Sequence, residues 1–302
     1  MTQDPRLLAQ DSRLFWFIFN PKSGTRFERK VAKIKAVIKA ESQKTGAKVV
    51  IKTTTHPGHA AELARQAAKE GVTVVVAVGG DGTMNEVARE LLNSPTAVGI
   101  VPMGSGNGLA RHLGISMNVE AATHQVFYSP TRLIDSALLN EIAFFCTAGM
   151  GFDAYVAGQF AQQTRRGFAT YLQTSITSFQ KYQPQVYRFA GQSQRLFTLS
   201  FANASQFGNN AYIAPRASTE DGLLDVCQLK PFSVLNGLDL ARRLFDRSLD
   251  ESSYAHIEKT TTFNVQTDTP PLIHYDGESL QLTTNEIRVQ IVPTSLRIVA
   301  PF

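Results

Sequence analysis

The stretch Val72-Thr-Val-Val-Val-Ala-Val-Gly-Gly-Asp-Gly-Thr83 joins an apolar run to a glycine-rich turn. The run over residues 72–78 is nearly all β-branched, which is typical of a parallel strand buried on both faces. Three glycines within the next four residues let the backbone turn tightly beneath a ligand. Thr83 and Glu86 have capping-box spacing, so we expect a helix over residues 83–92 whose N-terminus favours an anion such as a nucleotide phosphate. Taken alone, the motif also fits an ordinary strand-to-helix connection, because the Gly-Lys-Ser/Thr of a Walker A loop is missing.

The composition is that of a soluble protein with room for two cores. The chain has 302 residues, of which 43% are hydrophobic and 18% charged. Cys146 and Cys227 lack metal or redox spacing and are expected to be buried thiols in a reducing compartment. The apolar run over residues 14–19 is too short for a signal peptide or a membrane span. We therefore expect a cytoplasmic protein.

The positive charge is concentrated near the N-terminus. The net charge is +5, and residues 22–52 hold ten Lys or Arg against Glu28 and Glu41. Such a patch favours peripheral contact with an anionic membrane surface, although lysines that alternate with apolar residues also fit a plain solvated helix face. Phe27 is the one aromatic residue among the basic ones, too few for the stacking of a single-strand binder, so we do not expect a nucleic-acid partner.

The pattern of apolar and polar residues changes near residue 131. Before it, strands are expected over residues 14–19, 48–52, 72–78 and 98–101, and helices over residues 26–40, 58–69 and 83–92. This alternation predicts a doubly wound α/β domain. After it, segments such as 197–201 and 287–291 alternate with period two and predict antiparallel sheet, with helices near 153–182 and 233–247.

Glycine and hydroxyl or amide side chains recur where the expected strands of the first half end. These loops lie at residues 20–24, 53–58, 79–83 and 102–107. In open α/β sheets ligands bind outside the carboxyl ends of the strands, so four such loops describe a cradle for a polyphosphate. A handful of charge-assisted hydrogen bonds, about 1.5–3 kcal/mol each, is enough for micromolar nucleotide binding.

The motifs, taken in order, resemble the diacylglycerol kinase catalytic-domain family, which includes bacterial lipid kinases and sphingosine kinases. The resemblance rests on Asn20-Pro-Lys-Ser-Gly24, Gly79-Gly-Asp-Gly-Thr-Met-Asn-Glu86, Pro102-Met-Gly-Ser-Gly-Asn-Gly-Leu-Ala110, Gly151-Phe-Asp-Ala154, Asp221-Gly-Leu-Leu224 and Asp276-Gly-Glu278. It implies an ATP-dependent, Mg²⁺-requiring kinase that phosphorylates a lipid hydroxyl. It also implies an α/β nucleotide-binding domain over residues 1–131, rejoined by the tail 293–302, and a β-rich, sandwich-like lipid-substrate domain over 132–292. The active site would lie in the cleft between them.

The resemblance also implies roles for individual residues. Asp81 would lie near the phosphates and Mg²⁺, and Asp276 or Glu278 would be the catalytic base; the pair Asp276-Gly277 is equally a hairpin-turn signal. The residues expected to hold the nucleotide are Asn20, Pro21, Lys22, Ser23, Gly24, Thr54, Gly79, Gly80, Asp81, Gly82, Thr83, Asn85, Glu86, Gly104, Ser105 and Asn107. A structural Mg²⁺ is expected at Ser218, Asp221 and Leu223, partly through backbone carbonyls.

One departure bears on the substrate. Many bacterial diacylglycerol kinases of this family have an acidic residue and an aromatic where this chain has Gly108 and Leu109, and the loop is closer to the sphingosine-kinase form. Either kind of lipid therefore stays open. Apolar residues between 155 and 179 fit an acyl-chain channel or simple core. A kinase of a soluble substrate related to NAD kinase, a non-catalytic nucleotide- or lipid-binding module, and a homodimer also stay open.

Overall fold

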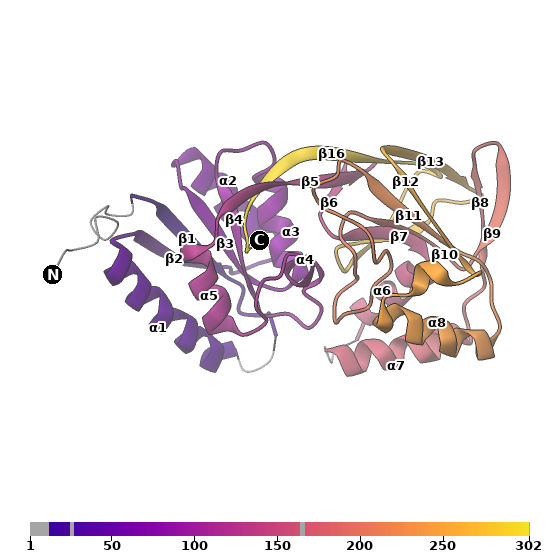
Figure 1. The fold of residues 1–302 in the computed structure, drawn as a ribbon, viewed down its shortest axis with the longest axis horizontal. Helices are drawn as coiled ribbons and strands as arrows, with labels where there is room; N and C mark the ends of the chain where they lie inside the picture. Colours follow the sequence, from indigo (N-terminus) through magenta and orange to yellow (C-terminus); the bar gives the residue numbers. More distant parts are fainter. Residues whose placement is uncertain (1–11, 25–26, 164–166, 302) are drawn as a thin grey trace.

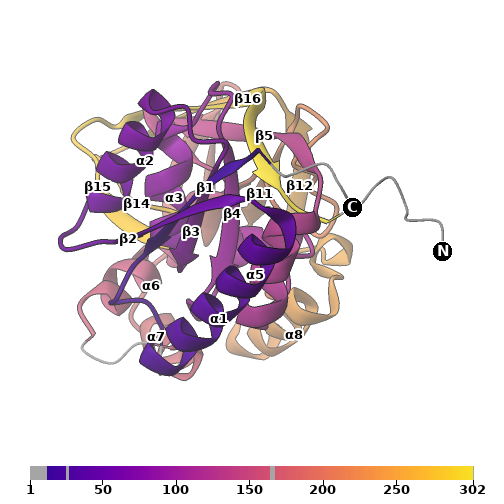
Figure 2. The ribbon, with the colours of Figure 1, turned by 90° about the vertical axis from the view of Figure 1, so that its left-hand side faces the viewer.

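The computed structural model describes residues 12–24, 27–163 and 167–301. Its first half is built on four parallel strands in the order β2 (Lys48–Thr53), β1 (Leu14–Phe19), β3 (Val74–Gly79) and β4 (Ala97–Pro102). The helices α1 (Phe27–Thr45) and α5 (Val119–Tyr128) cover one face, and α2 (His59–Lys69) and α3 (Asp81–Glu90) cover the other (Figure 2). The short helix α4 (Gly108–His112) follows β4. This is the predicted doubly wound arrangement.

β3 is the centre of the first core, and every one of its residues is buried. β1 and β4 flank it on either side, and its valines are packed between the helices of both faces. Because this strand has no solvent face, its sequence is a continuous apolar run instead of an alternating one.

The second half consists mainly of antiparallel strands. One sheet has the order β12 (Ala255–Thr260), β11 (Leu224–Leu229), β10 (Thr198–Ala202), β7 (Thr147–Gly151), β14 (Leu272–Tyr275) and β15 (Glu278–Gln281). The other half of the first sheet contains β5 (Thr131–Leu139), β6 (Ile142–Phe144), β8 (Gln185–Phe189), β9 (Gln192–Leu196), β13 (Thr262–Thr267) and β16 (Glu286–Val299). The helices are α6 (Phe152–Ala161), α7 (Phe168–Phe179), α8 (Val234–Asp246) and the 3₁₀ turn η2 (Leu249–Glu251).

β16 runs through both halves of the molecule (Figure 1). Its beginning pairs with β13, and Ile298 lies beside Val98 of β4. From Val289 to Val299 it pairs with β5, with an irregularity between Val292 and Leu296. Accordingly, Ile287 is part of the second apolar core, whereas Leu296 and Ile298 are part of the first. The bounds of the two domains stay a prediction; residues 1–11 and 302 lie outside the described part of the chain.

Element ends differ from the sequence expectation in several places. α3 begins at Asp81 instead of Thr83, and α1 continues to Thr45. The helical stretch 153–182 is divided into α6 and α7, and residues 164–166 between them lie outside the described part, as does residue 26. α5 was not predicted, although Asn118 marks its start by accepting hydrogen bonds from the N–H groups of Glu120 and Ala121.

Candidate functional site

Three of the four predicted loops meet at the carboxyl ends of β1, β3 and β4. The Asn20 N–H donates to the Val78 carbonyl at 3.1 Å, and the Met103 N–H donates to the Gly79 carbonyl at 2.7 Å. Gly24 has φ +72°, and a Cβ built on it would lie 2.0 Å from the Met103 carbonyl oxygen. The first loop can therefore reach the last one only through a glycine.

Glycines also let the loop after β3 (residues 79–83) and the loop after β4 (residues 102–107) pack backbone against backbone. A Cβ on Gly104 would lie 2.8 Å from the Cα of Gly80, and one on Gly106 would lie 3.0 Å from Asp81 Oδ2. Side chains would fill the space over the N-terminus of α3. Gly80 is the N-cap of that helix and has no side chain to bond its free N–H groups, which therefore remain available to an anion.

The capping box predicted for Thr83 and Glu86 is wrong, because the helix begins two residues earlier. Thr83 Oγ1 instead accepts a hydrogen bond from Asn20 Nδ2 at 2.9 Å and links two of the loops. The Glu86 carboxylate accepts the N–H groups of Gly58 and Ala60, both at 3.2 Å. Glu86 thus caps α2, whose own N-cap residue is a glycine.

Asp81 is held by the start of α4. Its carboxylate oxygens accept the N–H groups of Asn107 at 2.8 Å and Gly108 at 2.9 Å. Burial, opposed by these two hydrogen bonds and reinforced by the negative charge of Asp276, raises the pKa of Asp81 to about 6. A carboxylate in this state gains from a cation, which fits the Mg²⁺ of a bound nucleotide.

Asp276 lies in a two-residue hairpin turn, with φ +45° at Asp276 and +86° at Gly277. Its buried carboxylate accepts four hydrogen bonds. The donors are Asn85 Nδ2 at 2.8 Å and the N–H groups of Phe145, Cys146 and Thr147 at 2.9, 2.8 and 3.3 Å. Burial nevertheless leaves the pKa of Asp276 raised. Asn85 also donates to the Ala143 carbonyl, so its amide joins α3 to the second half and leaves no N–H for a nucleotide.

Glu278 follows two residues later and is exposed. Within the described part of the chain, the Glu278 carboxylate makes no hydrogen bond or ion pair. A Cβ built on Gly82 would lie 2.7 Å from Glu278 Oε1, so the carboxylate lies directly against the first turn of α3. Two acidic turns, nearly 200 residues apart in sequence, therefore meet at one point.

The remaining predicted nucleotide residues differ in exposure. Lys22 and Ser105 are exposed beside the loops, whereas Ser23 and Thr54 are buried. Pro21 is exposed and Asn107 is buried, where its amide donates to the Gly104 carbonyl. A separate cavity of about 620 Å³ lies between β9 and β12, far from these loops, and we do not place the active site there.

Gly108 has a packing reason for being glycine. A Cβ on it would lie 2.6 Å from Cys146 Sγ and 3.0 and 3.1 Å from the carbonyl oxygens of Gln206 and Phe207. An acidic side chain at this position would collide with the second half of the molecule. The departure from the bacterial pattern is thus matched by a close contact between the two halves.

The predicted structural metal site does not fit a metal ion. Ser218, Asp221 and Leu223 lie in one loop, but Asp221 Oδ2 is 2.5 Å from Lys259 Nζ and Asp221 Oδ1 accepts the Leu223 N–H. Ser218 Oγ accepts the N–H of Glu220. The one carboxylate of the predicted set is therefore already bound to a cationic side chain.

Two groupings of side chains were not predicted from the sequence. His56, His59 and Glu62 lie within 4.8 Å of one another beside the loop after β2, and their spacing of three residues along a helix start was the available signal. His274 Nε2 lies 3.0 Å from Asp153 Oδ2, which also accepts a hydrogen bond from Ser200. This buried group ties β14, which leads into the Asp276 turn, to α6.

Comparison with known proteins agrees with this architecture. Residues 14–139 match the diacylglycerol kinase catalytic domain, and residues 146–300 match the YegS C-terminal NAD kinase beta sandwich-like domain. A probable lipid kinase YegS-like of Chromohalobacter salexigens is 26% identical over 95% of this chain and 93% of its own length. A probable lipid kinase YegS of Escherichia fergusonii is 28% identical over 83% of this chain and 86% of its own. A putative diacylglycerol kinase from Bacillus anthracis has the same fold, with a TM-score of 0.76 at 19% identity, covering 96% of this chain and 97% of that one.

The fold and the site thus define a two-domain kinase. The chain belongs to the diacylglycerol kinase catalytic-domain family and carries the YegS type of C-terminal domain. The family resemblance and the fold class expected from the sequence are confirmed.

Proposed function

We propose that this kinase transfers the γ-phosphoryl group of ATP to a hydroxyl group of a lipid, either diacylglycerol-like or sphingoid-like, with Mg²⁺ bound to the nucleotide. The observation that carries the proposal is the contact of Glu278 with the first turn of α3 at Gly82. It brings an unpaired carboxylate to the place where the N–H groups of the glycine-rich turn would hold phosphates. The relatives from Chromohalobacter salexigens and Escherichia fergusonii are named probable lipid kinases.

Glu278 is the better candidate for the base. Asp276 already accepts four hydrogen bonds, so its lone pairs are occupied and its role is to fix the turn. Glu278 is exposed and lies against α3, where it would accept the proton of the lipid hydroxyl as that oxygen attacks the γ-phosphorus and the bond to ADP breaks. Mg²⁺, when bound, would neutralise charge on the transferred group. Asp81, at the start of α3 beside the glycine-rich turn, would help to hold it.

A kinase assay with γ-labelled ATP tests this function. The acceptors are diacylglycerol, a sphingoid base, ceramide, phosphatidylglycerol and NAD, and we expect label in one of the lipids. Glu278→Gln should lower turnover by about 10²- to 10⁴-fold, because the proton then has no acceptor. Gly82→Ala should lower it as well, since its Cβ would displace the Glu278 carboxylate without removing it.

Other outcomes would lead to other conclusions. Label in NAD alone would show a soluble substrate, and no label with any acceptor would show a binding module without catalysis. Full turnover in Glu278→Gln would remove Glu278 from the chemistry. Asp276→Asn serves as the comparison, since its loss should lower stability together with activity.

We also propose peripheral membrane contact from the cytoplasm. Among the described residues, no helix has the length and apolar character needed to cross a bilayer. The exposed residues Leu235 and Leu238 of α8 and Ile176 of α7 are apolar, with Leu235 80% accessible. In both views, α1, α7 and α8 lie along the same lower side of the molecule (Figures 1 and 2). α1 carries the exposed lysines of the basic N-terminal region, which suits an anionic surface.

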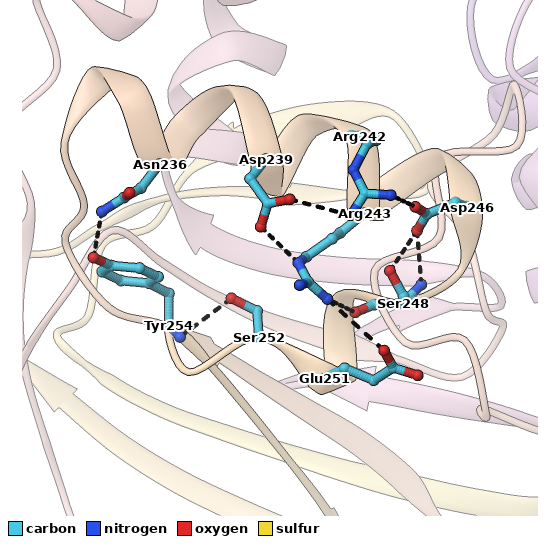
Figure 3. Close-up of polar contacts among 9 residues, drawn as sticks. All are labelled: Asn236, Asp239, Arg242, Arg243, Asp246, Ser248, Glu251, Ser252 and Tyr254. Atoms are coloured by element: carbon cyan, nitrogen blue, oxygen red, sulfur yellow. Dashed lines mark hydrogen bonds and ion pairs between the residues drawn. The ribbon is translucent and has the colours of Figure 1, made fainter.

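The other flank of α8 is fixed to the protein (Figure 3). Asp239 binds Arg243 at 2.7 Å, Arg243 donates to the Ser248 carbonyl at 3.1 Å, and Asn236 bonds to Tyr254. Because these contacts hold the helix in place, its apolar face would meet a bilayer without being reordered. We expect that face to insert shallowly, as an amphipathic surface helix does.

A further inference from the structure

The ammonium of Lys259 reaches the loop in which the family resemblance implies a metal ion. Lys259 is on β12, directly opposite Asp225 of β11 in the strand register. Its ammonium nitrogen is 2.5 Å from Asp221 Oδ2, 3.4 Å from Asp225 Oδ2 and 3.4 Å from the Arg216 carbonyl oxygen. The ammonium thus donates hydrogen bonds to Asp221 Oδ2 and to the Arg216 carbonyl, and it forms an ion pair with Asp225 Oδ2.

Asp225 makes a cation at this place necessary. Its side chain is 4% exposed, and its Oδ2 atom has no hydrogen-bond partner among the described residues. A buried carboxylate without a counter-charge is strongly unfavourable. The ammonium of Lys259, itself 35% exposed, is the positive charge that faces this atom.

The atoms around the ammonium are of the kind that bind a hard divalent cation. Mg²⁺ prefers carboxylate and carbonyl oxygens, and the loop offers two carboxylates and one carbonyl. We propose that Lys259 is the resident cation of this loop and that its ammonium takes the place of a structural divalent metal. The loop of this chain is then complete without Mg²⁺.

The position of the loop explains why it needs a cation. Asp135 of β5 accepts the N–H of Gly222 at 2.8 Å and the N–H of Thr294 of β16 at 2.7 Å, and its own N–H donates to the Thr219 carbonyl at 2.7 Å. The loop is thus fastened to the two strands that run between the halves of the molecule. A positive charge between Asp221 and Asp225 offsets the repulsion of the two carboxylates and so stabilises the loop in the conformation that bonds to Asp135.

The test measures thermal unfolding without nucleotide, with either EDTA or millimolar MgCl₂ present. Lys259→Met should lower the unfolding midpoint by about 4 °C or more, because it leaves Asp225 without its counter-charge. Lys230→Met is the matched control, since the exposed Lys230 follows the neighbouring strand β11 and has no ion pair among the described residues. An equal, small effect of both substitutions would overturn the proposal.

The dependence of the unfolding midpoint on Mg²⁺ shows whether the loop is filled by the Lys259 ammonium or by a metal ion. The rise in midpoint caused by Mg²⁺ should be the same in the native protein and in Asp221→Asn; a larger rise in the native protein would show that the loop binds metal and would overturn the proposal. Lys259→Ala opens the space between the two carboxylates, so Mg²⁺ should raise the unfolding midpoint of this variant more than that of the native protein. The double variant with Asp221→Asn should not show this additional rise. Absence of the additional rise in Lys259→Ala would show that these carboxylates form no cation site and would also overturn the proposal. The readout is stability, so it is independent of the kinase reaction.

Discussion

Asp81, Asp276 and Glu278 gather at one point, and each is in a different state. Asp81 is held by two backbone N–H groups, Asp276 is saturated by four donors, and Glu278 is exposed. Among the described residues no Lys, Arg or His forms an ion pair with any of the three. Such a concentration of negative charge is costly in the empty site, and it favours a cationic or cation-bound ligand.

The raised pKa of Asp81 predicts a pH-dependent cost in stability. Its ordinary value is about 4, and burial raises the pKa to about 6, so the folded state prefers the protonated form. The stability from this preference is present in full below about pH 4 and is lost as pH rises through 6. We expect the free energy of unfolding, relative to Asp81→Asn, to fall by at most about 3 kcal/mol between pH 4 and pH 7.

Denaturant unfolding at a series of pH values, without nucleotide, measures this difference. Asp221→Asn serves as the control, because its pair with Lys259 lies in another part of the molecule. A difference between the native protein and Asp81→Asn that does not change with pH would contradict the prediction.

At the scale of the element, α3 connects three parts of the fold. Its start faces the ligand loops, Asn85 reaches the Asp276 turn, and Glu86 caps α2. The capping box predicted for Thr83 and Glu86 is wrong, since Thr83 caps no helix and Glu86 caps α2 instead of its own helix. A sequence pattern cannot tell a cap within one helix from a cap supplied to its neighbour, because both need only an acceptor near free N–H groups.

Glu86→Ala tests the cap between the helices. It removes two hydrogen bonds from the N-terminus of α2, and we expect a loss of about 1–2 kcal/mol in the free energy of unfolding. Glu90→Ala, one turn later on the same helix, removes the partly exposed ion pairs with Arg65 and Arg89 and should cost less than about 1 kcal/mol. Equal losses, measured by chemical denaturation, would show that the cap contributes nothing beyond an ordinary ion pair.

At the scale of the whole molecule, periodicity predicted the fold class and the motifs predicted the loops that meet. The strands of the first half were placed within about two residues, because a strand buried on both faces has a strong apolar signal. The family resemblance offered Glu278 as a candidate base, but its contact with Gly82 could not be predicted, since it depends on how two distant segments are brought together. The Lys259 contacts escaped notice for the same reason: a lone lysine on an edge strand has no local signature.

The proposed membrane contact involves the whole side of the molecule that carries α1, α7 and α8. The double substitution of Leu235 and Leu238 by Gln should weaken sedimentation with phosphatidylglycerol vesicles at every salt concentration, because apolar insertion is not screened. Lys35→Gln with Lys39→Gln should weaken it mainly at low salt.

Leu133→Gln is the control, as this residue is also an exposed leucine, although less accessible than Leu235 and Leu238, and lies on β5. Binding that is unchanged by both double substitutions would exclude this side as the docking surface. Binding to phosphatidylcholine vesicles with equal strength would exclude a role for the lysines.

The course of β16 has a consequence for how the protein is made. β4 has β3 on one side and β16 on the other, and these two neighbours lie far apart in the sequence. While the ribosome is still synthesising the second half, β4 is therefore an unpaired edge of an apolar sheet. We expect the nascent first domain to be a client for chaperones until residues 296–299 emerge and cover it.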